Sequence, residues 1–236
     1  MRDLTCAFCF LARDCARRLP STLAWIEQAG SEFSYWRAFG YENDSRDETA
    51  KILSEWAERQ PKAATCTEAA GRRPWGMVRS AQRGTDMADY RNRCRRLMLN
   101  GMPDADVVVV LDADLKRIDM DGLGDTMSRW GDFDVMASNG LRCDNGTWVQ
   151  ADAWAWRSET WDPLDFQQVK HHTPLADEAP QRLLSAFGGM AVYRGDAYRA
   201  AEYGGGDCEH VVLHRRLYEV GYDRLYLNPA QVAIYP

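Results

Sequence analysis

The sequence predicts an α/β fold in which helices cover a mostly parallel β-sheet, and two observations support this class while a third narrows it. In the first half of the chain, strand-like and helical patterns alternate in the order β-α-β-α-β-α-β, which is typical of a parallel sheet flanked by helices. Residues 106–114 read Asp-Val-Val-Val-Val-Leu-Asp-Ala-Asp, an apolar run long enough for a fully buried strand and too short for a helix. No Gly-x-Gly-x-x-Gly follows the first strand, so a dinucleotide-binding Rossmann fold is disfavoured.

The elements of the first half follow from their hydrophobic patterns. Short apolar runs predict strands, and the longer stretches between them predict helices. The strands are expected at residues 5–11, 33–41, 63–67 and 106–111, and the helices at 17–29, 47–59 and 86–99. In the second of these helices, Ile52, Leu53 and Trp56 form an apolar stripe. Ser45 followed by Glu48 matches a capping box at its start.

The second half of the chain is less regular. A helix at 121–130 and a strand at 134–138 come first. Residues 140–186 are rich in Trp, Asp, His and Pro and show little periodicity, as expected of loops that line a binding cleft. Regular structure is expected to return with a strand at 188–193, a helix at about 207–220 and a strand at about 225–227.

Length and composition favour a single domain over residues 1–236. The chain is 45% hydrophobic, which is sufficient for a core of ordinary size. No apolar stretch approaches 18 residues, which predicts no transmembrane helix, and the N-terminal residues lack a signal-peptide pattern. The seven cysteines have no regular spacing. We therefore expect reduced, mostly buried thiols in a cytoplasmic protein.

Charge is distributed unevenly along the chain. The net charge is −6, yet the segment from Arg72 to Arg96 holds eight arginines and only two acids, Asp86 and Asp89. The overall acidity argues against wholesale nucleic-acid binding, whereas the local cluster suits a phosphate-bearing ligand. For most of these arginines, including Arg93 and Arg95, we expect a solvated position on a helix surface.

Two carboxylates end the strand predicted at 106–111. Asp112 and Asp114 are two residues apart, so their side chains point to the same side of an extended strand. Like charges at the rim of a buried sheet repel each other unless a cation or strong donors lie between them. Such a pair suits Mg²⁺ or Mn²⁺, which take oxygen ligands and often also hold a phosphate. The alternative is a solvated turn that caps the next helix.

Three motifs resemble, in the same order, those of GT-A glycosyltransferases, and the pattern is similar to family-2-like enzymes and to the capsule-associated mannosyltransferases of fungi. Residues 41–49, Tyr-Glu-Asn-Asp-Ser-Arg-Asp-Glu-Thr, resemble the acidic segment that recognises the nucleotide. Asp112-Ala113-Asp114 resembles the DxD motif, and Asp207-Cys208-Glu209-His210 resembles the late acidic motif. The resemblance covers roughly residues 5–229 and rests on three motifs rather than on one.

The resemblance implies a GT-A fold with a nucleotide-sugar-binding half at about 1–138 and a smaller acceptor-binding half at about 139–236. It implies a metal-dependent glycosyltransferase that moves a sugar from a UDP- or GDP-sugar to a hydroxyl acceptor. Mn²⁺ or Mg²⁺ would stabilise the departing diphosphate. The residues implied in binding the donor and its metal are Asp44, Arg91, Asp112, Ala113, Asp114, Gly188 and Gly189.

The late motif departs from the family pattern. Glu209 matches the first acid of the usual Glu-Asp pair, and His210 replaces the second, which is the general base of inverting members. The base is therefore expected to be Glu209, Asp207 or His210. Alternatively, His210 is a third metal ligand beside Asp112 and Asp114. His214, one helical turn later, is a second candidate for either role.

The acceptor is less defined than the donor. A glycan or lipid-linked glycan is the default, and a protein or a modified DNA base is the alternative. Trp154 and Trp156 offer indole faces for an acceptor sugar, although packing would also explain them. A function of another class, a catalytically inactive nucleotide-sugar-binding scaffold, stays open. A phosphatase is disfavoured because its DxD would follow the first strand, and a nucleotidyltransferase because no Gly-rich basic loop follows that strand.

Overall fold

The structure is a computed structural model that describes residues 1–76 and 78–236. Its strands form one mixed sheet in the order β3-β2-β1-β4-β9-β6-β10-β5, with β7 beside β6 and β8 beside β10. The strands are β1 (Thr5–Ala12), β2 (Tyr35–Asn43), β3 (Ala63–Glu68), β4 (Val107–Asp112), β5 (Arg117–Ile118), β6 (Val135–Asp144), β7 (Thr147–Gln150), β8 (Gln181–Arg182), β9 (Met190–Arg194) and β10 (Leu225–Ile234). The helices are α1 (Leu19–Gly30), α2 (Thr49–Arg59), α3 (Ala81–Gly101), α4 (Met120–Ser128), α5 (Phe166–Val169), α6 (Gly195–Ala200) and α7 (Glu209–Glu219).

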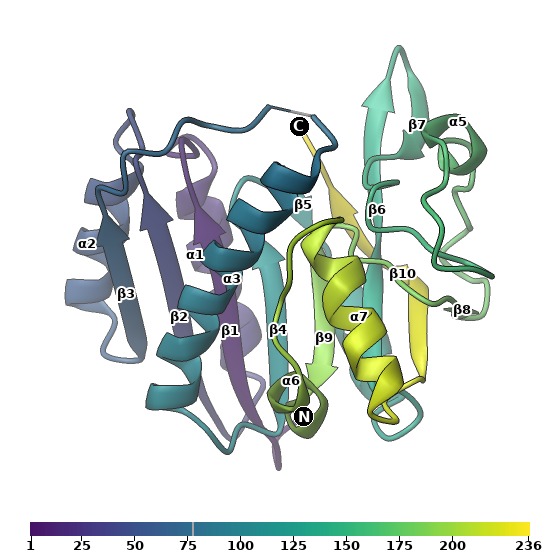
Figure 1. Cartoon of the computed structure of the whole chain (residues 1–236). Helices are drawn as coiled ribbons and strands as arrows, with labels where there is room; N and C mark the ends of the chain where they lie inside the picture. Colours follow the sequence, from purple (N-terminus) through teal and green to yellow (C-terminus); the bar gives the residue numbers. More distant parts are fainter. Residues whose placement is uncertain (77) are drawn as a thin grey trace.

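The predicted parallel arrangement is confirmed for the first four long strands. β1 pairs in parallel with β2 and β4, and β2 pairs in parallel with β3. β9 then joins β4 in the antiparallel direction. Helices α3 and α7 cover one face of the sheet, while α1 and α2 lie on the other (Figure 1). The α/β class with a mostly parallel sheet is therefore correct.

Alternation along β1 divides the core into two layers. Phe8 and Phe10 point toward α1 and α2, where they meet Trp25 and Trp56 edge-to-face. The alternate positions of the strand join the core cluster on the α3 and α7 side. Cys6 and Cys9 are three residues apart and belong to different layers. Their thiols therefore face opposite sides of the sheet and cannot share one metal ion.

Several sequence expectations need correction. α2 begins at Thr49, and Ser45 does not cap it, because the Ser45 hydroxyl accepts a hydrogen bond from the Asp14 amide at 3.1 Å. Asp47 instead accepts from the Thr49 amide at 3.0 Å. The helix expected at 86–99 begins five residues earlier, where the Ser80 side chain caps it. The stretch 140–186 contains β7, α5 and β8 in addition to loops, and the final strand extends to Ile234.

One arginine of the charged segment is not on the surface as expected. Arg95 is only 5% exposed. Its guanidinium donates to the carbonyl oxygens of Tyr198 and Arg199 at the end of α6. Arg93 is half-buried and pairs with Glu68 at 2.6 Å. The guanidinium groups of Arg93 and Arg95 are hydrogen-bonded to protein acceptors and their aliphatic stems pack against the protein. These two arginines therefore stabilise the fold.

No helix in the described part of the chain is long and apolar enough to cross a membrane.

Candidate functional site

The predicted site residues lie at the edge of the sheet where the parallel strands end. β1, β2, β3 and β4 run in the same direction, so their carboxyl ends meet at one edge (Figure 1). Asp44 directly follows β2, and Asp112 ends β4. In open α/β sheets, ligands bind beyond these carboxyl ends. The topology therefore brings the first and second acidic motifs of the sequence to a common edge.

Asp112 is held in place by three partners. The Arg91 guanidinium, which is 3% exposed, donates to one carboxylate oxygen at 2.6 Å. The Tyr235 hydroxyl donates to the other oxygen at 3.2 Å, and the Asp112 amide donates to the Gly189 carbonyl at 2.9 Å. Hydrogen bonds between a guanidinium and a carboxylate are short and directional. The Asp112 side chain is thus fixed in orientation, with Arg91 beside it, and the predicted contact of Arg91 with the nucleotide stays a prediction.

Asp114 differs from Asp112 because no arginine neutralises it directly. Ala113 between them packs into the core and its carbonyl accepts from Thr22 at 3.1 Å, so both carboxylates are turned away from the core. Asp114 is exposed to solvent, yet surrounding protein removes part of its hydration. This desolvation, followed by the charge of Asp112, raises the pKa of Asp114 from 3.8 to about 6. An exposed acid with a raised pKa indicates a concave, negatively charged position that would favour a cation.

The glycine turn before β9 contacts this pair. Gly188 and Gly189 both have a positive φ, 63° and 85°, which glycine adopts without strain. A Cβ on Gly188 would lie 2.1 Å from the carbonyl oxygen of Ser138. The backbone therefore approaches β6 so closely that only glycine fits. The turn lies beside Asp112, whose amide donates to the Gly189 carbonyl, and its contact with a donor sugar stays a prediction.

Asp152 is a site residue that the sequence interpretation missed. Its carboxylate accepts from the Gly188 amide at 3.2 Å. Burial, followed by the charge of Asp112, raises the pKa of Asp152. The residue lies in the aperiodic stretch after β7, where no spacing marks it. Its only signal in the sequence is its place in a loop-rich segment expected to line a cleft.

Asp44 is engaged with its own chain. It has a positive φ of 55°, and its carboxylate accepts from the amides of Gly71 and Arg72 at 2.8 and 3.1 Å. The Asn43 side chain donates at 2.9 Å; this bond, followed by the backbone bonds, lowers the pKa of Asp44. Asp44 thus forms a turn that ties the segment after β3 to the end of β2. Contact with a nucleotide stays a prediction.

The three candidate bases of the late motif occupy different environments. Asp207 forms a two-pronged ion pair with the buried Arg157 at 2.8 and 3.0 Å. Glu209 is 4% exposed and lies 3.8 Å from Arg91, and burial, only partly offset by that arginine, raises its pKa. His210 is 3% exposed and stacks on Phe187 with 3.7 Å between ring centroids. Burial, followed by the charge of Arg91, lowers the pKa of His210 well below 6.5, so its ring is neutral.

The histidines do not join the acidic pair. Across residues 1–76 and 78–236, no three His, Cys, Asp or Glu side chains come together as a metal site. His210 is not grouped with Asp112 and Asp114 in this structure, because its ring stacks on Phe187 in the core, and its role as a third ligand stays a prediction. His214 bonds to the Ser185 and Tyr193 hydroxyls at 2.9 and 3.0 Å, so it is a buried packing residue.

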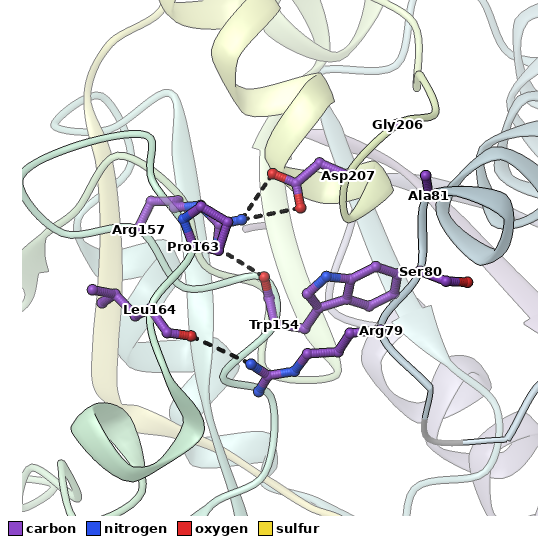
Figure 2. Close-up of a pocket in the computed structure, with 9 residues that line it drawn as sticks. All are labelled: Arg79, Ser80, Ala81, Trp154, Arg157, Pro163, Leu164, Gly206 and Asp207. Carbon is purple, nitrogen blue, oxygen red and sulfur yellow. Dashed lines mark hydrogen bonds and ion pairs between the residues drawn. The ribbon is translucent and has the colours of Figure 1, made fainter.

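A cavity of about 240 Å³ opens beside the late motif (Figure 2). Asp207 and Trp154 line it together with Arg79 and the first residues of α3. Trp156, the other expected acceptor residue, lines a separate cavity of about 280 Å³ with His172. Of the three predicted catalytic residues, Asp207 is the one that lines either of these two cavities.

Comparison with known proteins identifies the fold. No family model and no curated protein matches the sequence. Among solved structures, residues 1–349 of S. aureus TarS superpose with a TM-score of 0.57 at 12% identity, covering 100% of this chain and 60% of that chain. The mannosyltransferase PcManGT from Pyrobaculum calidifontis, in complex with GDP-Man and Mn²⁺, gives 0.59 at 16% identity, covering 99% and 57%.

A third solved structure agrees with these two. Glucosyl-3-phosphoglycerate synthase from Mycobacterium tuberculosis gives a TM-score of 0.54 at 12% identity, covering 95% of this chain and 69% of that chain. This chain spans about 60% of the length of the TarS fragment and of the archaeal mannosyltransferase. The chain has the GT-A fold, as the three motifs predicted.

Proposed function

We propose that this protein is a metal-dependent glycosyltransferase that moves a sugar from a UDP- or GDP-sugar to an acceptor hydroxyl, by default on a glycan or lipid-linked glycan. The observation that carries the proposal is the pair Asp112 and Asp114 at the carboxyl end of β4, with Arg91 fixed on Asp112 at 2.6 Å. The fold neighbours agree with this class. Solved structures of TarS contain UDP-GlcNAc, PcManGT contains GDP-Man and Mn²⁺, and GalNAc-T7 contains UDP, GalNAc and Mn²⁺.

The acidic pair fits a divalent cation. Two carboxylates on one side of a strand end give the oxygen donor set of Mg²⁺ or Mn²⁺. Loss of hydration, followed by the charge of Asp112, raises the pKa of Asp114, and a bound cation would offset both effects. When bound, the cation would stabilise the negative charge that grows on the departing diphosphate. Asp112 and Asp114 would hold it, and Arg91 would keep the Asp112 carboxylate oriented.

Glu209 and Asp112 flank the same guanidinium, at 3.8 and 2.6 Å. We therefore assign Glu209 a positioning role toward Arg91 rather than contact with the acceptor. His210 is enclosed behind Phe187 and lacks access to a ligand in this structure.

Proton transfer from the acceptor hydroxyl then falls to Asp152 or Asp207. Asp152 lies against the Gly188 amide near Asp112, and its raised pKa makes it the better proton acceptor near neutrality. Both Asp207 oxygens already accept from Arg157. A carboxylate has about four acceptor positions, so Asp207 keeps capacity to orient a hydroxyl in the cavity.

A donor screen tests the function. Purified protein is mixed with UDP- and GDP-sugars, with Mn²⁺ or with EDTA, and both the melting temperature and the released nucleoside diphosphate are measured. We expect sugars linked to one of the two nucleotides, UDP or GDP, to raise the melting temperature and to release their nucleoside diphosphate slowly. Both effects should require the metal. Asp114→Asn should abolish both signals, and Asp104→Asn, an exposed acid before the opposite end of β4, should keep them. Stabilisation without any release or transfer would favour the inactive scaffold instead.

A further inference from the structure

One wall of the cavity beside the late motif is held in place by hydrogen bonds from a buried arginine. Arg157 is 1% exposed, and its guanidinium donates to the carbonyl oxygens of Trp154, Trp156 and Trp161 at 2.7–3.0 Å. The same group forms the two-pronged pair with Asp207. The buried guanidinium of Arg157 therefore ties the loop after β7 to Asp207, two residues before α7, and it fixes one side of the cavity (Figure 2).

The opposite side of the cavity is the start of α3. Ser80 and Ala81 line it, and α3 is 21 residues long. A Cβ on Gly84, one turn into α3, would lie 1.8 Å from the Asp207 carbonyl oxygen. The helix therefore contacts the Asp207 backbone directly, and the two walls are held at a fixed separation.

The charge of this cavity is positive. Asp207 is neutralised by Arg157, so it adds no net negative charge to the wall. Arg79 lines the cavity and uses one N–H on the Leu164 carbonyl at 3.3 Å. Arg83 lies over the Trp154 ring at 4.6 Å and uses one N–H on the Val78 carbonyl at 3.3 Å. A guanidinium has five N–H donors, so Arg79 keeps most of its donors for a ligand in the cavity. Arg83 does not line the cavity and adds positive charge beside it, and the α3 N-terminus adds partial positive charge.

The cavity also adjoins the proposed donor site. Trp154 lies two residues after Asp152, whose carboxylate contacts the Gly188 turn. Arg83 is near enough to act on the charge of Asp152. A hydroxyl held at Asp207 and Trp154 would therefore lie on the acceptor side of the proposed donor site. At about 240 Å³, the space is below the roughly 300–1,000 Å³ of drug-sized ligands and suits a single sugar unit.

We propose that this cavity is the acceptor subsite and that it selects an acceptor sugar carrying an anionic group, a phosphate or a carboxylate, which Arg79 binds on the cavity wall and Arg83, next to the wall over the Trp154 ring, attracts. This inference rests on the proposed glycosyltransferase function. Trp154 supplies apolar contact to the sugar ring, and Asp207 orients a hydroxyl. The planar fork of guanidinium matches phosphate and carboxylate oxygens, which explains an arginine without a carboxylate partner on the wall of a cavity that a neutral sugar would not require.

Binding measured in EDTA separates this subsite from the metal-dependent donor site. Isothermal titration with glucose 6-phosphate, glucuronate and glucose compares a phosphate, a carboxylate and a neutral sugar. We expect the two charged probes to bind, and glucose at least about tenfold more weakly. Arg79→Gln and Arg83→Gln should each weaken the charged probes about tenfold or more, while Arg96→Gln, an exposed arginine on the same helix, should not. The probe with the lower Kd identifies the anion.

Equal binding of all three probes, no binding of the charged probes, or binding unaffected by Arg79→Gln and Arg83→Gln would overturn the subsite. The donor screen with Mn²⁺ is independent of these arginines. A protein that releases a nucleoside diphosphate but shows no preference for charged probes would therefore refute the subsite and leave the proposed function intact. The reverse pattern would refute the function while leaving an anion-binding cavity.

Discussion

Replacing Asp114 by Asn should stabilise the metal-free protein while abolishing its response to metal. The native pKa of about 6 lies above the ordinary 3.8, so the ionised carboxylate opposes folding. At 1.36 kcal/mol per pKa unit, this difference corresponds to roughly 3 kcal/mol. Because Asp114 is exposed to solvent, screening reduces the expected effect to about 1 kcal/mol. For a chain of this size, that is a rise of about 2–4 °C in Tm.

The sign of the effect depends on pH. A raised native pKa adds stability that is fully present below pH 3.8 and is lost as pH rises through about 6. The gain from Asp114→Asn should therefore appear at pH 8 and vanish near pH 4. Mn²⁺ at 100 times its Kd should stabilise the parent protein by about 2.7 kcal/mol and the variant not at all.

Urea unfolding in EDTA at pH 4 and pH 8, followed by thermal unfolding with Mn²⁺, measures these effects. Asp104→Asn is the matched control, because its carboxylate is exposed at the opposite edge of the sheet. If Asp114→Asn is less stable than the parent at pH 8, or if it still gains stability from Mn²⁺, then Asp112 and Asp114 are not a mutually repelling pair that binds a cation.

Three further substitutions test the supports of the site. Arg91→Met leaves Asp112 without its buried partner and should lower the free energy of unfolding in urea by about 3–5 kcal/mol; a loss below about 1 kcal/mol would contradict a buried ion pair. Gly188→Ala places a Cβ 2.1 Å from the Ser138 carbonyl at a positive φ and should cost at least about 1 kcal/mol in the same assay, so an unchanged midpoint would speak against the tight turn. Tyr235→Phe removes a hydrogen bond to Asp112 and should cost about 1 kcal/mol, with a weaker Mn²⁺ response in thermal unfolding; an identical response would exclude a role for this hydroxyl at the metal site.

Sequence patterns within a few residues were sufficient to predict where Asp112 and Asp114 lie. Burial on both faces requires the valines of 107–110, and the period of two turns Asp112 and Asp114 to one side. The sheet order follows from alternating strands and helices, so the position of the pair at a carboxyl edge was also predictable. Gly188 and Gly189 were predicted only through the family resemblance, and the structure adds a reason for glycine at 188, where a Cβ would lie 2.1 Å from the Ser138 carbonyl oxygen.

The remaining features depend on contacts between distant segments. The Asp152 carboxylate accepts a hydrogen bond from the Gly188 amide, 36 residues later in the sequence. No pattern in the residues around Asp152 predicts this contact. Arg95 was expected in solvent because charge favours the surface, yet carbonyls at the end of α6 satisfy its guanidinium. Ser45 has the spacing of a cap, but the Asp14 amide from the loop after β1 takes its oxygen. Which of several possible partners a side chain binds is decided by tertiary structure, and residue spacing alone does not predict it.

The most direct test of the account is the position of Mn²⁺ in crystals grown with Mn²⁺ and the nucleoside diphosphate that stabilises the protein. Anomalous scattering at the manganese edge locates the ion without assumptions about the ligand. We predict one strong peak within coordination distance of Asp114 and Asp112, with the diphosphate oxygens on its far side. A well-ordered diphosphate with no peak at these two carboxylates, or a peak elsewhere in the protein, would contradict the account.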